Sequence, residues 1–308
     1  MSRKPRPTPL FAELSSLVTE GALPESSQID LAETPEVLRV IHAEDRRVPA
    51  AVEACLSEIA QVVDAVVTSF DRGGRLLYVG AGTSGRLGIL DAAECPPTFG
   101  TDPREVVGVI AGGAESVFRA QEGAEDDAVA GGASMDEHSV EARDTVVGIA
   151  ASRRTPFVLG ALSRARELGA GTALVTCNPG GDAQDAADVL IAPVVGPEVI
   201  SGSTRMKAGT ATKLVLNMIT TAAMIRRGKT LGNLMVDLRP GSEKLIERSR
   251  RIVMEVAGVG YEEAAGLLQD AEGSVKVAIV MGVASVGLAE AKERLARAGG
   301  FVRRAMEA

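Results

Sequence analysis

Residues 75–100 read RLLYVGAGTSGRLGILDAAECPPTFG and join an apolar strand, a glycine-rich turn and a helix. The short apolar run 75–79 is typical of a buried parallel strand. The turn after it contains three glycines, which allow tight bends and close approach of a ligand: Gly80, Gly82 and Gly85. Thr83 and Ser84 add two hydroxyls. Because a helix that begins near Ser84 directs free N–H groups and its positive dipole end at this turn, the stretch predicts a site for a phosphate or a carboxylate.

Glu94 lies at the far end of the same helix, directly before Cys95-Pro96-Pro97. We expect the two prolines to stop the helix at or before Cys95. A carboxylate near a helix C-terminus is unfavourable by up to about 1 kcal/mol. Two interpretations of Glu94 therefore remain open, a solvated residue at a helix end and a functional carboxylate.

The composition is that of a globular chain. Of its 308 residues, 45% are hydrophobic and 24% are charged, which suits one large domain with an appendage, or two domains. The formal net charge of −8 argues against a general nucleic-acid or membrane-surface binder, because such a protein needs a basic face. We therefore expect no nucleic-acid or membrane partner, and any anionic ligand must be held by local groups.

The cysteines and histidines predict no metal site. Three cysteines without CxxC spacing indicate neither a disulfide framework nor a zinc site, and two histidines are too few for a histidine-rich one. No apolar run approaches the roughly 20 residues needed to span a bilayer, and the basic N-terminus lacks a long apolar core. We expect an unexported, cytoplasmic protein.

Short runs rich in β-branched residues alternate with helical patterns along the chain, which is the signature of an α/β protein with a parallel sheet. After 75–79 these runs are 106–110, 145–150, 172–177 and 189–193. Residues up to about 24 look loosely structured. Helices are predicted from residue 34 and over 49–70, and both are expected to pack over the sheet.

A second hydroxyl-bearing turn follows the strand 145–150 and reads ASRRTP, residues 151–156. In an open α/β sheet, ligands bind at the carboxyl ends of the strands, so Ser152 and Thr155 are candidates for the same phosphate site as Thr83 and Ser84. Ordinary helix capping is the alternative for Ser152 and Thr155.

Residues 121–127, QEGAEDD, place Glu122 and Glu125 three positions apart, although Gly123 makes a long helix there unfavourable. Clustered like charges raise a carboxyl pKa, which suits a general acid or base. An ordinary acidic surface loop remains the alternative.

Residues 196–210 open a long apolar helix that runs to about 225, with Ser203 or Thr204 as its predicted cap. Arg205 and Lys207 fall in the first turn, where cations oppose the helix dipole, so we expect a nearby anion. The anion is a carboxylate of this chain, a partner subunit or a substrate.

From residue 241 the pattern changes to alanine-rich amphipathic segments, which are 243–257, 261–269, 274–281 and 288–297. This change predicts a helical bundle over 241–308 beside a domain over 1–240.

Six motifs together closely resemble the N-acetylmuramic acid 6-phosphate etherases, a branch of the sugar isomerase (SIS) fold that also includes the glucokinase regulatory protein. They are GAGTSGRLGILDAAECPPTFG, VIAGG, EGAEDD, GIAASRRTP, GPEVISGSTRMKAGTATKLVLNM and GNLMVDL. The resemblance runs from about residue 17 to the C-terminus. It implies an SIS-type open parallel sheet flanked by helices, a small ubiquitin-associated-like helical bundle, a homodimer whose subunits complete each other's sites, and no cofactor or metal.

The resemblance also implies a carbon–oxygen lyase that cleaves the lactyl ether of N-acetylmuramic acid 6-phosphate in cell-wall recycling, giving D-lactate and N-acetylglucosamine 6-phosphate. It assigns Glu94 as the proton donor and Glu125 as the second acid/base residue. Candidates for holding the amino-sugar phosphate are Gly82, Thr83, Ser84, Ser152, Arg154 and Thr155, with Glu122 and Lys207 as weaker ones.

One position departs from the family, which usually reads AASGRTP where this chain has Arg153 in place of the glycine. An arginine there either strains the turn, if its φ is positive, or adds a phosphate contact. Two other functions stay open. A sugar-phosphate isomerase would use the same phosphate turns, and a non-catalytic sugar-phosphate regulator would need no acid or base, although its relatives carry two SIS domains where this chain has room for one.

Overall fold

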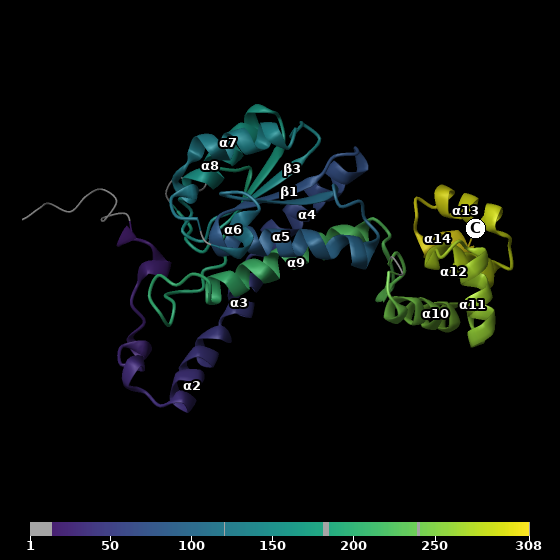
Figure 1. Cartoon of the computed structure of the whole chain (residues 1–308), viewed down its shortest axis with the longest axis horizontal. Coiled ribbons are helices and arrows are strands. Elements are labelled where there is room, and N and C mark those ends of the chain that lie inside the picture. The colour runs from purple at the N-terminus through teal and green to yellow at the C-terminus, as the bar shows by residue number, and fades with distance from the viewer. Residues whose placement is uncertain (1–13, 120, 181–184, 239–240, 308) are drawn as a thin grey trace, which may run out of the picture. The chain divides into compact units, whose positions relative to one another are not determined.

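The computed structural model describes residues 14–119, 121–180, 185–238 and 241–307 (Figure 1). These residues form two compact units. One contains the described residues up to Asp91 together with Val107–Ile219, and the other contains Ala92–Val106 together with the described residues from Thr220 onward. The predicted boundary between residues 240 and 241 stays a prediction.

A five-stranded sheet forms the centre of the first unit, with the strand order β2-β1-β3-β4-β5 (Figure 1). Strands β1, β3, β4 and β5 pair in parallel. The strands span Leu76–Gly80 (β1), Val106–Ile110 (β2), Thr145–Ile149 (β3), Gly171–Val175 (β4) and Val189–Ile191 (β5). All five predicted strands are confirmed, and the α/β prediction with them. β1 and β3 are buried at every position because helices cover both faces of a parallel sheet.

Helices α7 and α8 pack against each other unusually closely over β3. They span Ala128–Glu137 and Pro156–Glu167. A Cβ on Gly131 would come within 2.0 Å of the carbonyl oxygen of Phe157, and one on Gly160 within 2.0 Å of that of Ala128. Only glycine fits at these two crossing points, because any side chain would collide with backbone. The close contact fixes α8, and therefore the turn that precedes it, against the sheet.

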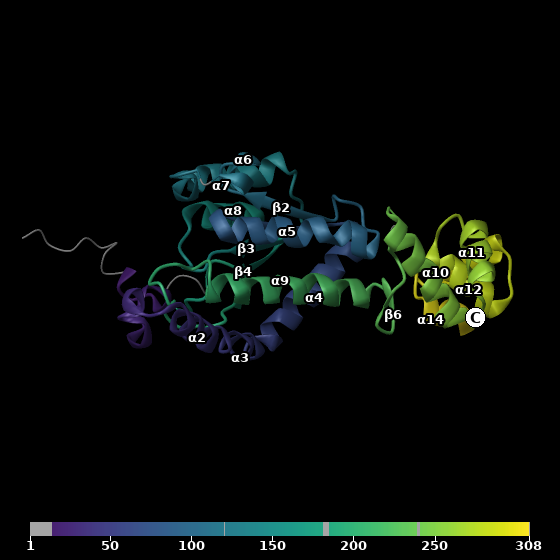
Figure 2. The same cartoon turned by 60° about the horizontal axis from the view of Figure 1, so that its bottom comes forward.

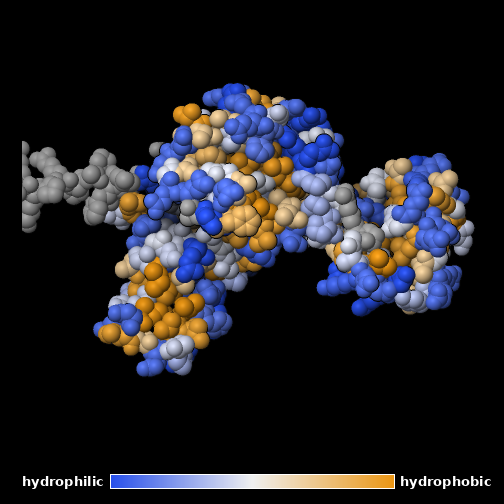
Figure 3. Space-filling model, viewed as in Figure 1, coloured by the Kyte–Doolittle hydropathy of each residue, from blue (hydrophilic) through white to orange (hydrophobic). Residues whose placement is uncertain are grey.

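The N-terminal helices differ from the prediction in two respects. The single helix expected over 49–70 is divided into α3 (Val48–Glu53) and α4 (Leu56–Asp71), because the backbone leaves the helical region at Cys55. Helix α4 packs on β1, β3 and β5 as expected. Helix α2 (Thr34–Asp45) does not pack over the sheet, since Leu38 is 59% exposed and Figure 3 shows apolar surface over this helix.

The prediction that residues up to about 24 are loosely structured is wrong for the part that the structure describes. A 3₁₀ turn, η1, spans Val18–Glu20, and Leu17 and Leu23 on either side of it are buried. These apolar side chains pack the segment against the first unit. The proline-rich sequence before it favoured the prediction of a loose segment. Residues 1–13 of the predicted loose segment lie outside the described residues.

Helix α5 spans Gly82–Phe99 and continues through Pro96 and Pro97, so the predicted stop at or before Cys95 is wrong. Each proline lacks the N–H that would donate to the carbonyl four residues earlier, so two helical hydrogen bonds cannot form in the last turns of α5. Cys95 and Phe99 are both buried, and the N–H of Gly100 still donates to the carbonyl of Pro96 at 3.0 Å. Burial of these two side chains offsets the cost of the prolines.

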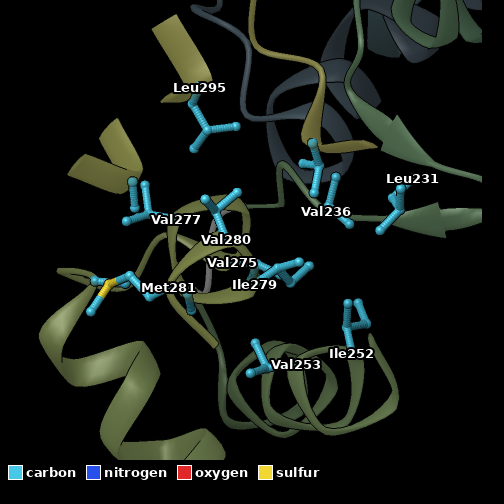
Figure 4. Packing of buried hydrophobic residues seen from close by; sticks show 14 of the residues in the cluster. Leu231, Val236, Ile252, Val253, Val275, Val277, Ile279, Val280, Met281 and Leu295 are labelled. Carbon is cyan, nitrogen blue, oxygen red and sulfur yellow. The ribbon is translucent and has the colours of Figure 1, made fainter. Parts of the chain in front are cut away.

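Long helix α9 spans Lys207–Arg226, close to the predicted bounds (Figure 2). The four predicted helices after residue 241 are confirmed as α10 (Glu243–Ala257), α11 (Tyr261–Asp270), α12 (Val275–Ala284) and α13 (Leu288–Arg297). A short ribbon of β6 (Thr230–Leu231) and β7 (Leu234–Met235) and helix α14 (Val302–Glu307) were not predicted. Residues of α12 such as Ile279 and Val280 lie at the centre of the apolar core of this bundle (Figure 4).

Candidate functional site

A cavity of about 400 Å³ opens in the first unit at the carboxyl ends of β1 and β3. It brings together seven of the predicted site residues: Gly82, Thr83, Ser84, Glu125, Ser152, Arg154 and Thr155. The carboxyl ends of parallel strands are where an open α/β sheet forms its ligand sites. The two hydroxyl-bearing turns, which are 70 residues apart in sequence, therefore contribute to one site.

The first turn owes its shape to glycine. Gly82 has a φ of 53°, in the left-handed region that favours glycine. A Cβ on Gly80 would lie 2.6 Å from the N atom of Gly85, and one on Gly85 would lie 2.8 Å from the carbonyl oxygen of Gly80. The absence of both side chains lets the first turn of α5 lie directly against the end of β1. Thr83 and Ser84 consequently stand at the helix N-terminus, beside free N–H groups and the positive end of the dipole.

The second turn is held by the carbonyl group of Ala151. This oxygen accepts hydrogen bonds from the N–H of Cys177 at 3.0 Å, from Oγ1 of Thr176 at 3.1 Å and from Nδ2 of Asn178 at 2.7 Å. All three donors follow β4, so the neighbouring strand fixes the start of the turn. Asn178 is buried, which removes competition from water and strengthens its contribution.

The four hydroxyls of the two turns are unused in the described part of the chain. Thr83, Ser84, Ser152 and Thr155 make no side-chain hydrogen bond to any described residue. Thr155 stands at the N-cap position of α8, yet its side chain makes no capping bond, so ordinary capping is wrong as its explanation. Hydroxyls without protein partners at the N-termini of two helices are suited to receive the oxygens of an anion.

Glu125 reaches the cavity from the short 3₁₀ turn η4, Ala124–Asp126. Gly123 before it has a φ of 77°, and the carboxylate of Asp127 after it caps α7 by accepting from the N–H of Ala130 at 2.8 Å. Ala124 packs against the apolar core, so the turn is anchored on three sides. Glu122 precedes Gly123 and does not line the cavity, because the backbone reverses at that glycine.

Lys207 also lies outside the cavity lining, although it is only 1% exposed. Its ammonium forms an ion pair with the carboxylate of Glu44. The buried carboxylate of Glu198 accepts from the N–H groups of Lys207 at 3.0 Å and Ala208 at 2.9 Å. Glu198 therefore caps α9, which corrects the prediction of Ser203 or Thr204, and a carboxylate of this chain is confirmed as the anion beside Lys207. The substrate contact of Lys207 stays a prediction.

Glu94 is exposed on α5, in the second unit. It lies ten residues after Ser84 on that helix, which corresponds to about 15 Å along the helix axis. The role of Glu94 as proton donor stays a prediction.

Arg153 occupies the left-handed region with a φ of 63°. Its guanidinium Nη1 donates to the carbonyl of Pro179 at 3.1 Å, and Arg153 does not line the cavity. A non-glycine residue at this φ costs about 1 kcal/mol, so the first of the two alternatives, a strained turn, describes the structure.

This strain predicts an order of stability among variants of Arg153. Arg153→Ala removes the bond to Pro179 and keeps the left-handed backbone, whereas Arg153→Gly also relieves the backbone. We expect the glycine variant to be more stable than the alanine variant by about 1 kcal/mol, measured as the free energy of unfolding in urea. Equal stabilities, or the reverse order, would show that the turn is not strained.

The cavity also contains residues that the sequence did not single out as ligands. Glu20 and Thr204 approach from segments far from both turns, and Asp126 adjoins Glu125. The hydroxyl residues around Thr204 could have indicated a ligand-binding turn, since they precede a helix. The sequence gives no such indication for Glu20, because Glu20 belongs to a segment that is predicted to be loosely structured.

Two kinds of feature are absent from the described ranges. No group of three His, Cys, Asp or Glu side chains in them is arranged to hold a metal ion. No helix in the same ranges is long and apolar enough to cross a membrane.

Comparison with known proteins identifies the family. A family model described as the glucokinase regulatory protein N-terminal SIS domain matches residues 58–166. An N-acetylmuramic acid 6-phosphate etherase of Salinibacter ruber is 56% identical and aligns over 100% of this chain and 99% of its own. A Vibrio cholerae relative named N-acetylmuramic acid 6-phosphate etherase 2 is 51% identical and aligns over 97% of both chains.

Among solved structures, phosphoheptose isomerase from Neisseria gonorrhoeae aligns with a TM-score of 0.48 and 19% identity, over 62% of this chain and 99% of that one. The sequence relatives are far more similar and cover nearly the whole chain, so they decide the assignment. The resemblance found in the motifs is thereby confirmed. The chain belongs to the N-acetylmuramic acid 6-phosphate etherase family.

Proposed function

We propose that this protein is a carbon–oxygen lyase that cleaves the D-lactyl ether of N-acetylmuramic acid 6-phosphate and releases N-acetylglucosamine 6-phosphate and D-lactate. Family membership supports the reaction class. The observation that carries the proposal is the cavity, which brings two hydroxyl-bearing turns at helix N-termini and the carboxylate of Glu125 to one place.

The 6-phosphate is proposed to bind the two turns. The hydroxyls of Thr83, Ser84, Ser152 and Thr155 donate to its oxygens, together with free N–H groups at the start of α5, where Gly82 leaves the backbone accessible. Arg154, which also lines the cavity, supplies the positive charge that the chain's overall charge of −8 does not.

The ether is proposed to break by elimination. In the open-chain sugar the C2 proton is α to the C1 aldehyde, so a carboxylate can remove it. The electrons of the C2–H bond form a C2=C3 double bond, the C3–O bond breaks, and the lactyl oxygen receives a proton from an acid. Water then adds at C3 and C2 is reprotonated, which completes N-acetylglucosamine 6-phosphate.

Two carboxyl groups suffice for these reaction steps, and we assign them to Glu94 as the proton donor and Glu125 as the second acid/base residue. The position of Glu125 in the cavity supports its part. Glu122 and Lys207 remain further candidates for substrate contact, which for Lys207 requires its ammonium to leave Glu44.

Deuterium incorporation tests the reaction. When N-acetylmuramic acid 6-phosphate is converted in D₂O, elimination and water addition place one non-exchangeable deuterium at C2 of the sugar product, which mass spectrometry and NMR detect. Direct displacement of lactate by water leaves C2 protonated. D-lactate without deuterium at C2 would therefore contradict the elimination step.

We further propose that the protein works as a homodimer in which each subunit completes the other's site. Glu94 and Ser84 are separated by about 15 Å along the axis of α5, so Glu94 is remote from the turn that is proposed to hold the phosphate. A partner subunit can supply the second carboxyl group. Exposed apolar side chains support an interface, among them Leu31 at 79% and Leu38 at 59% exposure.

Mixing two inactive variants tests this arrangement. Glu94→Gln and Glu125→Gln homodimers are each expected to be inactive. In mixed dimers with shared sites, one site carries both substitutions and the other carries none. Random re-association then restores about a quarter of wild-type activity, since half the dimers are mixed and half their sites are intact. If both carboxyl groups of a site came from one subunit, mixing would restore nothing.

We propose that residues 1–240 form the sugar-phosphate domain and 241–308 a helical bundle. The apolar core that joins α10–α14 supports the bundle, and this core also includes Leu231, Val236 and Leu238. We also propose a cytoplasmic location. Its support is that Cys55, Cys95 and Cys177 are buried and form no disulfide bond, as is usual in a reducing compartment.

A further inference from the structure

We propose that Glu20 is a further substrate-binding residue, whose carboxylate accepts hydrogen bonds from the hydroxyl or acetamido N–H groups of the amino sugar. This inference rests on the proposed function and extends its site to a segment outside the sheet. Glu20 lines the same cavity as Thr83, Ser84, Ser152 and Glu125. It comes from η1, more than 50 residues before the first strand.

Buried contacts hold the backbone on the N-terminal side of Glu20. Thr19 is 0% exposed, and its N–H donates to Oδ1 of Asn178 at 3.3 Å while Nδ2 of Asn178 donates to its Oγ1 at 2.9 Å. The same Nδ2 also donates to the carbonyl of Ala151 at the start of the second turn. The buried carboxamide of Asn178 thus holds both the η1 segment and the second turn, so these two parts of the cavity lining are linked.

The C-terminal side of Glu20 is held by the loop before α9. Oγ of Ser201 donates to the carbonyl groups of Glu20 at 3.2 Å and Gly21 at 3.1 Å. The next residue, Gly202, leaves room for the Glu20 side chain, since a Cβ there would lie 3.2 Å from Oε2 of Glu20. The main chain of Glu20 is therefore fixed from both sides, which is the preorganisation that a binding residue needs.

The carboxylate of Glu20 makes no ion pair or hydrogen bond with any residue in the described ranges. A carboxylate at neutral pH only accepts hydrogen bonds, and it repels a phosphate. Its partners in the cavity must then be neutral donors at the end of the ligand away from the phosphate. An N-acetylated amino sugar offers such donors in its hydroxyl groups and its amide N–H.

A comparison of two ligands tests the assignment by isothermal titration calorimetry. The probes are N-acetylglucosamine 6-phosphate and inorganic phosphate, because only the first offers the neutral donors. Glu20→Ala is expected to weaken binding of the sugar phosphate about tenfold and to leave phosphate binding unchanged. Glu20→Gln keeps one acceptor oxygen and should fall between wild type and Glu20→Ala. The matched control is Glu25→Ala, an exposed glutamate of the same segment that does not line the cavity.

The possible outcomes separate this inference from the proposed function. If Glu20→Ala binds both probes as wild type does, or loses affinity for both equally, Glu20 does not contact the sugar and the inference is overturned. If the wild-type protein binds phosphate but not the sugar phosphate, the proposed function fails as well. Selective loss in Glu20→Ala, with Glu25→Ala unchanged, supports the inference.

Discussion

Glu125→Gln is expected to lower kcat for lactate release by about 10³-fold, with little change in the affinity for N-acetylglucosamine 6-phosphate. The substitution keeps the size of the side chain and removes its ability to accept and return a proton. Because η4 is anchored by Gly123, Ala124 and the Asp127 cap, the fold around it should not change. Steady-state lactate assays and calorimetric titration measure the two effects separately.

Asp126→Asn is the matched control, since Asp126 is the adjacent carboxylate and lines the same cavity. We expect this variant to keep activity within about tenfold of wild type, because its carboxyl group is assigned no proton transfer. Equal losses in the two variants would point to the negative charge of the turn as the important factor. A Glu125→Gln enzyme with near-normal kcat would remove Glu125 from the mechanism.

Glu44→Gln is expected to reduce the free energy of unfolding by about 3–5 kcal/mol. Glu44 is the ion-pair partner of Lys207, whose side chain is 1% exposed. The substitution leaves a buried ammonium without a counter-charge, and desolvation makes such a group costly. Urea titration followed by circular dichroism measures the change.

The partner variants identify the cause. Lys207→Met should cost less, since Glu44 retains its second ion pair with Arg47 at 3.2 Å. The double variant Glu44→Gln, Lys207→Met should regain much of the stability lost in Glu44→Gln. If instead Lys207→Met abolished binding of N-acetylglucosamine 6-phosphate and left stability unchanged, Lys207 would be a substrate ligand rather than a structural cation.

The ion pair also predicts a dependence of stability on pH. Burial raises the pKa of Glu44, but hydrogen bonds and charges from Lys207 and Arg47 outweigh burial and lower it below the usual 4.5. A lowered pKa in the folded state means that the stabilisation is complete above about pH 4.5 and is lost as the pH falls through the lowered value. The difference in stability between wild type and Glu44→Gln should therefore narrow at acid pH.

Much of the fold was predictable because its signals are local. Each strand of the sheet is a short β-branched run between turn residues, and the two hydroxyl-bearing turns follow such runs directly. The path of α5 through Pro96 and Pro97 was not predictable in this way. Burial of Cys95 and Phe99 decides it, and that burial depends on contacts made after the chain has folded.

The site was predictable to the extent that it is built from those turns. Seven of its residues follow from the strand-end rule and from the family motifs. Glu20 could not be found, because a hydrogen bond between Thr19 and Asn178, 159 residues apart, brings its segment to the cavity. Similarly, the pairing of Lys207 with Glu44 joins residues 163 apart, so the first-turn lysine was expected to have a counter-ion of unknown origin.

The most direct test of the central claim is to incubate the purified protein with N-acetylmuramic acid 6-phosphate, with nothing else added, and to assay D-lactate. We expect stoichiometric release of D-lactate and N-acetylglucosamine 6-phosphate, which would also show that Arg153 in the second turn is tolerated. Thermal stabilisation by the same compound without lactate would contradict the lyase assignment and indicate a sugar-phosphate sensor or a different substrate. If the protein releases no lactate and is not stabilised by the compound either, the phosphate site itself is contradicted.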